Sequence, residues 1–386
     1  MDRLHMDRDT LATLLEVSDI TTIKYDEIVD LFFQEKLPQK LPEGSFRIDP
    51  RNGDRILYHV SRSIRPHDNI PESRPPEEME LECVICRGET TGIVDVADLS
   101  EGFTFINKNL FPVLFPHKEG TENRSVFGRE EAPMPQGSAY GLHFLQWTSS
   151  FHDSDWHNMP VEDCRTVVSR LAALERKLID EAPEGMIGDE RPEGLDDAAG
   201  HVLIIKNYGR SVGASISHGH QQVLFSNITP SRALDHLAYQ VEHDEPLTTF
   251  ILRDTPVELL VKDYGVAVLL VPTFMRRPYE MFLVVKDTSK QYLNELSTEE
   301  ITAVGSGWHD ATRIFHHIMP RLDKEVAYNV ASFTGPGAGI YFEFLPNTQP
   351  MGALERIGMY VCQETPERAA DTIKESLKIV NEASEP

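Results

Sequence analysis

The sequence has few cysteines for its length and lacks a long hydrophobic run. Only 4 of its 386 residues are cysteine, too few for a disulfide-dense secreted scaffold. No apolar stretch approaches the ~20 residues that cross a bilayer. The start MDRLHMDRDT is polar, without the apolar core of a secretory signal. We therefore expect a cytoplasmic protein with no membrane partner.

Positive charge is also scarce. Lys and Arg number 37 against 62 Asp and Glu, so the formal net charge is -25. This balance argues against a nucleic-acid backbone or an anionic membrane as partner. A ligand that carries phosphate would be repelled at long range and would need Arg, Lys or backbone N–H donors placed locally.

The chain runs through the same order of expected elements twice. Its length and its ordinary content of hydrophobic (40%) and charged (26%) residues fit a soluble protein with two domains. Each pass is strand, strand, long helix, strand, glycine-containing loop, strand. The first pass comprises 102–109, 140–148, 160–181, 201–207, 208–217 and 218–226, and the second 265–273, 279–287, 298–319, 326–334, 335–339 and 340–346.

This order predicts an α+β fold of two duplicated halves, each a mainly antiparallel sheet with one long helix. We place an N-terminal extension at residues 1–80, the first half at 81–235 and the second half at 236–386.

The segment from Asn207 to Gln222 carries the most chemical information. It has the pattern N-x-G-x3-G-A-S-x2-H-x-H-x-Q. If His218 and His220 lie on one strand, they project to the same face. Gly213 and Ser215 lie in the preceding loop, where backbone N–H groups can bind an anion.

This pattern resembles the active-site motif of the galactose-1-phosphate uridylyltransferase family, a branch of the histidine-triad superfamily. The resemblance implies that His220 is a nucleophile that forms a covalent nucleotidyl-histidine. Triad hydrolases carry a third histidine where this chain has Gln222, so the glutamine favours transfer over hydrolysis. The resemblance also implies that Gln222 and Ser215 stabilise phosphate oxygens, and that Gly213 and Asn207 contact the substrate.

Other segments match the family in the same order along the chain. Arg62 and Arg65, in R-x-x-R-P, resemble arginines that approach phosphate, which makes residues 1–80 a phosphate-contacting arm. Asn109 resembles a residue of the nucleoside pocket and Glu355 one of the final segment, and the resemblance implies that both bind the substrate. The resemblance also implies one structural Zn²⁺ site, a closed tetrahedral shell in the first half made by Cys83, Cys86, His152 and His218.

The second half departs from the family pattern. Some relatives bind a second metal there through His-x-His, but this chain has Tyr341-Phe-Glu343, and His236 replaces an expected acidic residue. We therefore predict no second metal. Gln349 and Val361 replace residues that contact the hexose phosphate, so inorganic phosphate is an alternative acceptor.

Together these features predict a nucleotidyltransferase that moves a nucleoside monophosphate from a nucleotide-sugar or dinucleotide to a phosphate or sugar-phosphate acceptor. We expect a homodimer. Two alternatives stay open at this point. One is a nucleotide hydrolase of the histidine-triad type, and the other is a non-catalytic, zinc-stabilised nucleotide-binding protein.

Overall fold

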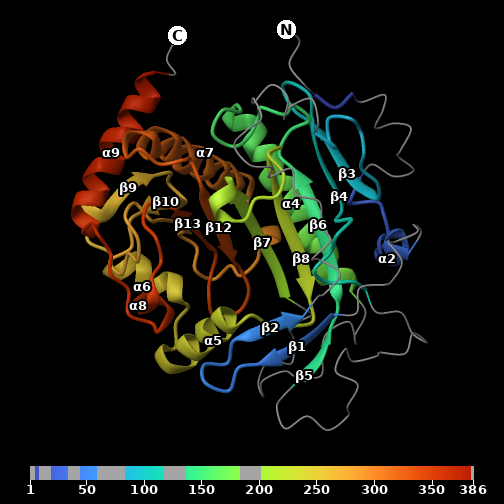
Figure 1. Cartoon of the computed structure of the whole chain (residues 1–386), viewed down its shortest axis with the longest axis horizontal. Helices are drawn as coiled ribbons and strands as arrows, with labels where there is room; N and C mark the ends of the chain where they lie inside the picture. Colours follow the sequence, from blue (N-terminus) through green and yellow to red (C-terminus); the bar gives the residue numbers. More distant parts are fainter. Residues whose placement is uncertain are drawn as a thin grey trace.

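A computed structural model describes residues 5–7, 19–33, 44–58, 83–116, 136–182 and 201–383 (Figure 1). A ten-stranded sheet forms its centre, and every strand pairing in it is antiparallel. Its strands are β3 (Ile93–Asp98), β4 (Phe103–Lys108), β6 (Gly141–Trp147), β7 (His201–Tyr208), β8 (His220–Ser226), β9 (Leu260–Asp263), β10 (Ala267–Leu270), β11 (Met281–Val285), β12 (Tyr328–Phe333) and β13 (Tyr341–Pro346).

The two halves of this sheet have the same strand order. From the centre outward, the first half is β7-β8-β6-β4-β3 and the second is β12-β13-β11-β10-β9. In each half the innermost strand is the one that follows the long helix, β7 or β12. The next strand along the chain, β8 or β13, pairs with it. This agreement confirms the predicted duplication and the α+β class. Tyr341 and Glu343 on β13 thus occupy the positions that His220 and Gln222 hold on β8.

The halves join through β7 and β12, which pair antiparallel from Tyr208↔Tyr328 to Ile205↔Ala331. The duplication therefore produces one continuous sheet.

Two long helices cover one face of the sheet, α4 (Val161–Glu181) and α7 (Thr298–Arg321). Buried residues recur along α4 at three- and four-residue spacing, which makes one apolar stripe. The helices pack closely, because a Cβ on Gly305 of α7 would lie 3.0 Å from the backbone nitrogen of Arg165 on α4. Trp156 and Trp308, with ring centroids 4.6 Å apart, fill the junction beneath the two halves.

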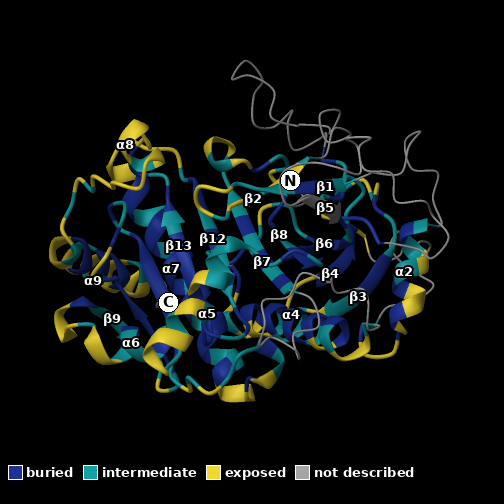
Figure 2. Ribbon diagram, turned by 90° about the horizontal axis from the view of Figure 1, so that it is seen from below, coloured by how far each residue is buried: buried dark blue, intermediate teal, exposed yellow. Residues whose placement is uncertain are grey.

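The remaining elements surround this framework (Figure 2). Helix α2 packs on α4, and α9 packs on α7. A small separate sheet has the order β2-β1-β5. These elements are α2 (Tyr25–Phe33), β1 (Gly44–Ile48), β2 (Arg55–Tyr58), β5 (Gln136–Ala139), α5 (Ser231–His243), α6 (Leu247–Asp254), α8 (Ala353–Arg356) and α9 (Pro366–Glu382). Within the described residues, no helix is both long and apolar enough to span a membrane.

The face of the sheet opposite α4 and α7 is only partly covered. Among the described residues, three separate apolar clusters lie on this face. One covers the first half of the sheet, the second lies against β1 and β5, and the third lies against α6. Between them, Asn329, Ala331 and Phe333 of β12 stay half-exposed, while the alternate residues of that strand are buried. The ladder register places His220 and Gln222 on this same open face.

Candidate active site and metal centre

His220 is the first residue of β8, and its ring is held by a backbone carbonyl. Its Nδ1 lies 2.9 Å from the carbonyl oxygen of His218, so Nδ1 carries the proton and Nε2 keeps its lone pair. The ring packs against Trp147, with centroids 4.9 Å apart. Burial lowers the pKa of His220 to about 4, which keeps the imidazole neutral at neutral pH. This is the state that a nitrogen nucleophile requires.

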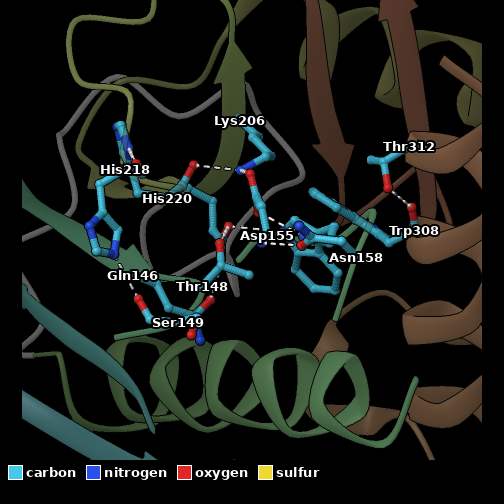
Figure 3. Close-up of polar contacts among 12 residues, drawn as sticks. Gln146, Thr148, Ser149, Asp155, Asn158, Lys206, His218, His220, Trp308 and Thr312 are labelled. Carbon is cyan, nitrogen blue, oxygen red and sulfur yellow. Dashed lines mark hydrogen bonds and ion pairs between the residues drawn. The ribbon is translucent and has the colours of Figure 1, made fainter. Parts of the chain in front are cut away.

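His218 is not part of the strand, contrary to the expectation of a pair on one strand. β8 begins at His220, and His218 lies in the bend before it. The alternation of strand side chains therefore does not apply to this pair. Figure 3 shows the His218 ring with its Nε2 at the carbonyl oxygen of Ser149, 2.8 Å away. With Nε2 engaged in this contact, the Nδ1 atom of His218 faces the sulfur atoms of Cys83 and Cys86.

Gln222 lies on the same face of β8 as His220, and a buried histidine orients its amide. The Nδ1 of His143 accepts the N–H of Val113 at 2.9 Å, so the proton of a neutral His143 is on Nε2. That Nε2 lies 3.1 Å from Oε1 of Gln222 and donates to it. The arrangement turns the NH2 group of Gln222 away from His143, and that group suits a phosphate oxygen.

The loop between β7 and β8 begins and turns at glycines with positive φ. Gly209 has φ +90°, and a Cβ there would lie 2.7 Å from the Cβ of Ala327. Gly213 has φ +91°, but a Cβ there would meet nothing within 4 Å, so conformation rather than space favours glycine. Gly213 is exposed and Ser215 half-buried in this loop.

Asn207 connects this loop to the second half of the chain. It pairs with Asn329 across β7 and β12, and the amide nitrogen of Asn329 donates to Oδ1 of Asn207 at 2.7 Å. The same nitrogen donates to the carbonyl oxygen of Val212 at 3.1 Å. Asn109 lies on the other side of the site, where its N–H donates to the carbonyl oxygen of His143 at 2.8 Å.

Cys83, Cys86, His152 and His218 come together as one cluster, with their donor atoms all within 4.8 Å of one another. Nδ1 of His218 lies 3.7 Å from Sγ of Cys83 and 3.5 Å from Sγ of Cys86, and Nδ1 of His152 lies 3.6 Å from Sγ of Cys86. Tetrahedral bonds of ~2.3 Å to sulfur and ~2.05 Å to nitrogen put the two about 3.6 Å apart. The four residues therefore fit a tetrahedral metal ion.

The surroundings of the cluster also suit a metal. Hydrogen bonds from Cys86 and from the two histidines lower the pKa of the Cys83 thiol, and the thiolate is the form that binds metal. The contact between His218 Nε2 and the Ser149 carbonyl fixes that ring with Nδ1 toward the sulfurs, as in other metal sites.

Of the other predicted site residues, two fall outside the described part of the chain and one lies away from this centre. Arg62 and Arg65 lie outside the described residues. Glu355 lies on α8, where its carboxylate accepts the N–H groups of Gly352 at 2.7 Å and Val361 at 3.3 Å. Figures 1 and 2 place α8 away from β8, on the side of β12 and β13. In this chain Glu355 therefore holds its own turn together.

The second half fills its equivalent site with internal contacts. The hydroxyl of Tyr341 lies 3.0 Å from Nε2 of His236, and Glu343 forms an ion pair with Arg232 at 3.3 Å. The loop before β13 is covered by α6, because a Cβ on Gly339 would lie 2.0 Å from Oγ1 of Thr248. The first half thus carries the open site.

Comparison with known proteins identifies this constellation. The sequence model for the galactose-1-phosphate uridyl transferase N-terminal domain matches residues 39–230, which include the metal cluster and the motif from Asn207 to Gln222. Residues 39–230 of this chain belong to the galactose-1-phosphate uridylyltransferase family. Members of this family are enzymes of the nucleotidyltransferase type, so the match confirms the predicted enzyme class.

Relatives match over most of their length. The ADP-glucose phosphorylase of Arabidopsis thaliana is 20% identical over 350 residues, which cover 85% of this chain and 92% of that protein. A solved uridylyltransferase structure has a TM-score of 0.62 at 19% identity, over 87% of this chain and 99% of that chain. The structure of the Arabidopsis thaliana ADP-glucose phosphorylase with bound ADP-glucose has a TM-score of 0.58 at 19% identity, with the same coverage. These likenesses confirm the fold.

Sequence reasoning missed four polar residues that shape the site, namely His143, Asp155, Lys206 and Asn329. His143 and Lys206 are polar side chains within strands of mostly apolar residues, GLHFLQW and HVLIIKNY. A buried charge in such a strand requires a partner, and this was the available signal. Asp155 and Asn329 carry no comparable signal, because their partners come from distant parts of the chain.

Proposed function

We propose that this enzyme transfers a nucleoside monophosphate from a nucleotide-sugar to inorganic phosphate through a covalent bond to His220. The observation that carries the proposal is the contact of His220 Nδ1 with the His218 carbonyl, which leaves Nε2 unprotonated on the open face. A non-catalytic nucleotide-binding protein has no need for a histidine held in this state.

The reaction has two displacements at the α-phosphorus. In the first, the lone pair of Nε2 forms the N–P bond, the bond from phosphorus to the bridging oxygen breaks, and the sugar phosphate leaves with that electron pair. In the second, a phosphate oxygen attacks phosphorus and the N–P bond breaks, which restores His220. No net proton transfer is needed, and the His218 carbonyl stabilises the positive ring of the intermediate through Nδ1–H.

Gln222 supports transfer over hydrolysis. With Oε1 held by His143, its NH2 group faces the reacting phosphate and donates to a non-bridging oxygen. An amide cannot act as a base toward water, whereas the third histidine of a hydrolase can. The loop with Gly213 and Ser215 supplies further N–H donors, and Asn207 and Asn109 flank the site.

Inorganic phosphate is favoured as acceptor because Gln349, which replaces a family residue that contacts the hexose phosphate, is hydrogen-bonded inside the chain. Gln349 is buried, its amide nitrogen donates to the Val361 carbonyl at 2.8 Å, and its Oε1 accepts the N–H of Gln363 at 3.1 Å. Both ends of this buried amide are therefore held by contacts within the chain. The relative named ADP-glucose phosphorylase supports the same choice.

We also propose that the metal at Cys83, Cys86, His152 and His218 is zinc. All four positions of a tetrahedral shell come from the protein, which is typical of structural zinc. Bound there, zinc would tie the turn at 83–86 and the turn at His152 to the bend at His218, two residues before the nucleophile.

We further propose a homodimer, with a second copy of the chain on the segment 351–361. Large apolar side chains are exposed along this segment, namely Met351 (38%), Leu354 (46%), Ile357 (78%), Met359 (62%), Tyr360 (42%) and Val361 (50%). An exposed apolar surface of this kind is typical of a protein interface.

We expect light scattering of the wild-type protein to give twice the chain mass, and Ile357→Lys to give the single-chain mass. A wild-type monomer at working concentrations would refute the dimer.

Steady-state kinetics test the reaction itself. Initial rates are measured with ADP-, UDP- and GDP-glucose against phosphate, galactose 1-phosphate and buffer alone. We expect parallel double-reciprocal lines, because the sugar phosphate leaves before the acceptor binds, and faster turnover with phosphate than with the sugar phosphate. Intersecting lines would contradict the covalent route, and equal turnover without acceptor would show a hydrolase.

A further inference from the structure

A buried ion pair lies directly behind the nucleophile, on the face of the sheet that α4 and α7 cover. Nζ of Lys206 on β7 is 2.7 Å from Oδ2 of Asp155, and both side chains are at most 5% exposed. Figure 3 shows this pair beside the backbone of His220. A buried pair of charges seldom adds net stability over an apolar pair, so its presence invites a role beyond folding.

The pair lies where two strands of the sheet separate. β7 pairs with β8 only as far as Ile205↔Gln222, and its last residues, Lys206 to Tyr208, pair with β12 alone. The carbonyl of Gly219 points to β6, where it accepts the N–H of Thr148 at 3.0 Å. Because successive carbonyls alternate in direction, the carbonyl of His220 points to β7, where the ladder no longer supplies a donor.

Lys206 supplies the missing donor. Its Nζ lies 3.1 Å from the carbonyl oxygen of His220 and donates to it, in place of a backbone N–H. Beyond this separation, Asn207 and the carbonyl of Val212 in the following loop are both hydrogen-bonded to Asn329 of β12. Lys206, whose side chain lies on the covered face, thus holds β8 to β7 at a point where the backbone pairing has ended.

Asp155 fixes the lysine and contacts the peptide next to the nucleophile. Its Oδ1 accepts the N–H of Trp156 at 2.8 Å. A Cβ on Gly219 would lie 2.7 Å from Cγ of Asp155. The glycine between the two histidines is therefore needed to admit this carboxylate.

We propose that Lys206, held by Asp155, is a positioning residue that keeps the backbone of His220 in place for attack on phosphorus. The inference rests on the proposed function of His220. Nucleophilic attack is sensitive to displacements of about 1 Å, so loss of this anchor slows the chemical step more than it weakens binding.

The test is a double variant that removes both charges, Lys206→Met with Asp155→Asn, made in the full chain. Because the variant loses the hydrogen bond from the charged lysine to the His220 carbonyl, we expect kcat to fall about 10- to 100-fold. KM, zinc content and the melting temperature should stay near wild-type values. The assay uses ADP-glucose and UDP-glucose with phosphate, and intact-mass measurement after rapid quenching follows formation of the nucleotidyl adduct.

The chain offers a matched control in Lys262→Met with Asp310→Asn. This second ion pair, 2.6 Å long, joins β9 to α7 in the other half, and its Asp310 is equally buried. We expect wild-type kcat from the control. Wild-type kcat from the Lys206 double variant, or an equal loss from both pairs, would overturn the proposal.

A third variant covers the case in which the double variant does not fold. Gly219→Ala keeps both charges but pushes Asp155 away, and we expect it to lower kcat in the same way; wild-type kcat would overturn the proposal. Wild-type enzyme that acquires no adduct from either sugar nucleotide would refute the proposed function instead, so the two failures are distinguishable.

Discussion

Replacing His220 with glycine removes the nucleophile, and we expect nucleotidyl transfer to fall by at least about 10⁴-fold. The fold should persist, because His220 is a polar residue at the first position of β8 and lies outside the main apolar core. The measurement is turnover of the sugar nucleotide with phosphate, together with the melting temperature and the zinc content of the variant.

Tyr341→Phe is the matched control for this variant. Tyr341 holds the position of His220 in the second half, and its hydroxyl contacts His236 at 3.0 Å. Loss of that contact should leave transfer near the wild-type rate. Near wild-type turnover by His220→Gly, or an equal loss in Tyr341→Phe, would contradict the assignment of the nucleophile.

Removal of the metal should have the second large effect. We expect one zinc per chain in protein purified without added metal. Cys83→Ser should lose it and lower the melting temperature by roughly 10 °C or more, because the binding energy of a structural zinc contributes to folding. Transfer should fall with it, since His218 supplies both a metal ligand and the carbonyl that holds His220. Elemental analysis and thermal unfolding measure these changes.

Cys362→Ser serves as the control, because Cys362 is a half-buried free cysteine that does not belong to the cluster. It should keep the zinc and the wild-type melting temperature. Protein without zinc, whose melting is also unchanged by a chelator, would refute the metal site.

The sequence predicted the features that depend on local patterns. Apolar periodicity located both long helices and most of the central strands, and the repeated element order predicted the duplicated halves. The candidate metal ligands and the candidate nucleophile could be named from the sequence because their residue types and spacing match a family motif. The structure then brought Cys83, Cys86, His152 and His218 together from three distant segments.

What the sequence did not predict depends on contacts between distant segments. No local pattern indicates that β7 leaves β8 after Ile205 and joins β12, so the role of Lys206 was hidden. The strand was expected to begin at His218 but begins at His220, and the His218 ring contacts the distant residues Cys83, Cys86 and Ser149. The bond from the Gly352 N–H to the Glu355 carboxylate was likewise not predicted, and the role of Glu355 toward the substrate stays a prediction.

The central claim is that His220 carries the nucleotide during transfer, and intact-mass spectrometry tests it most directly. The full chain is incubated with ADP-, UDP- or GDP-glucose without acceptor, quenched without acid, and weighed. We predict a mass increase of one nucleoside monophosphate, mapped to His220, which disappears when phosphate is added and never forms in His220→Gly. Turnover of the sugar nucleotide without any such adduct, or an adduct on another residue, would contradict the account.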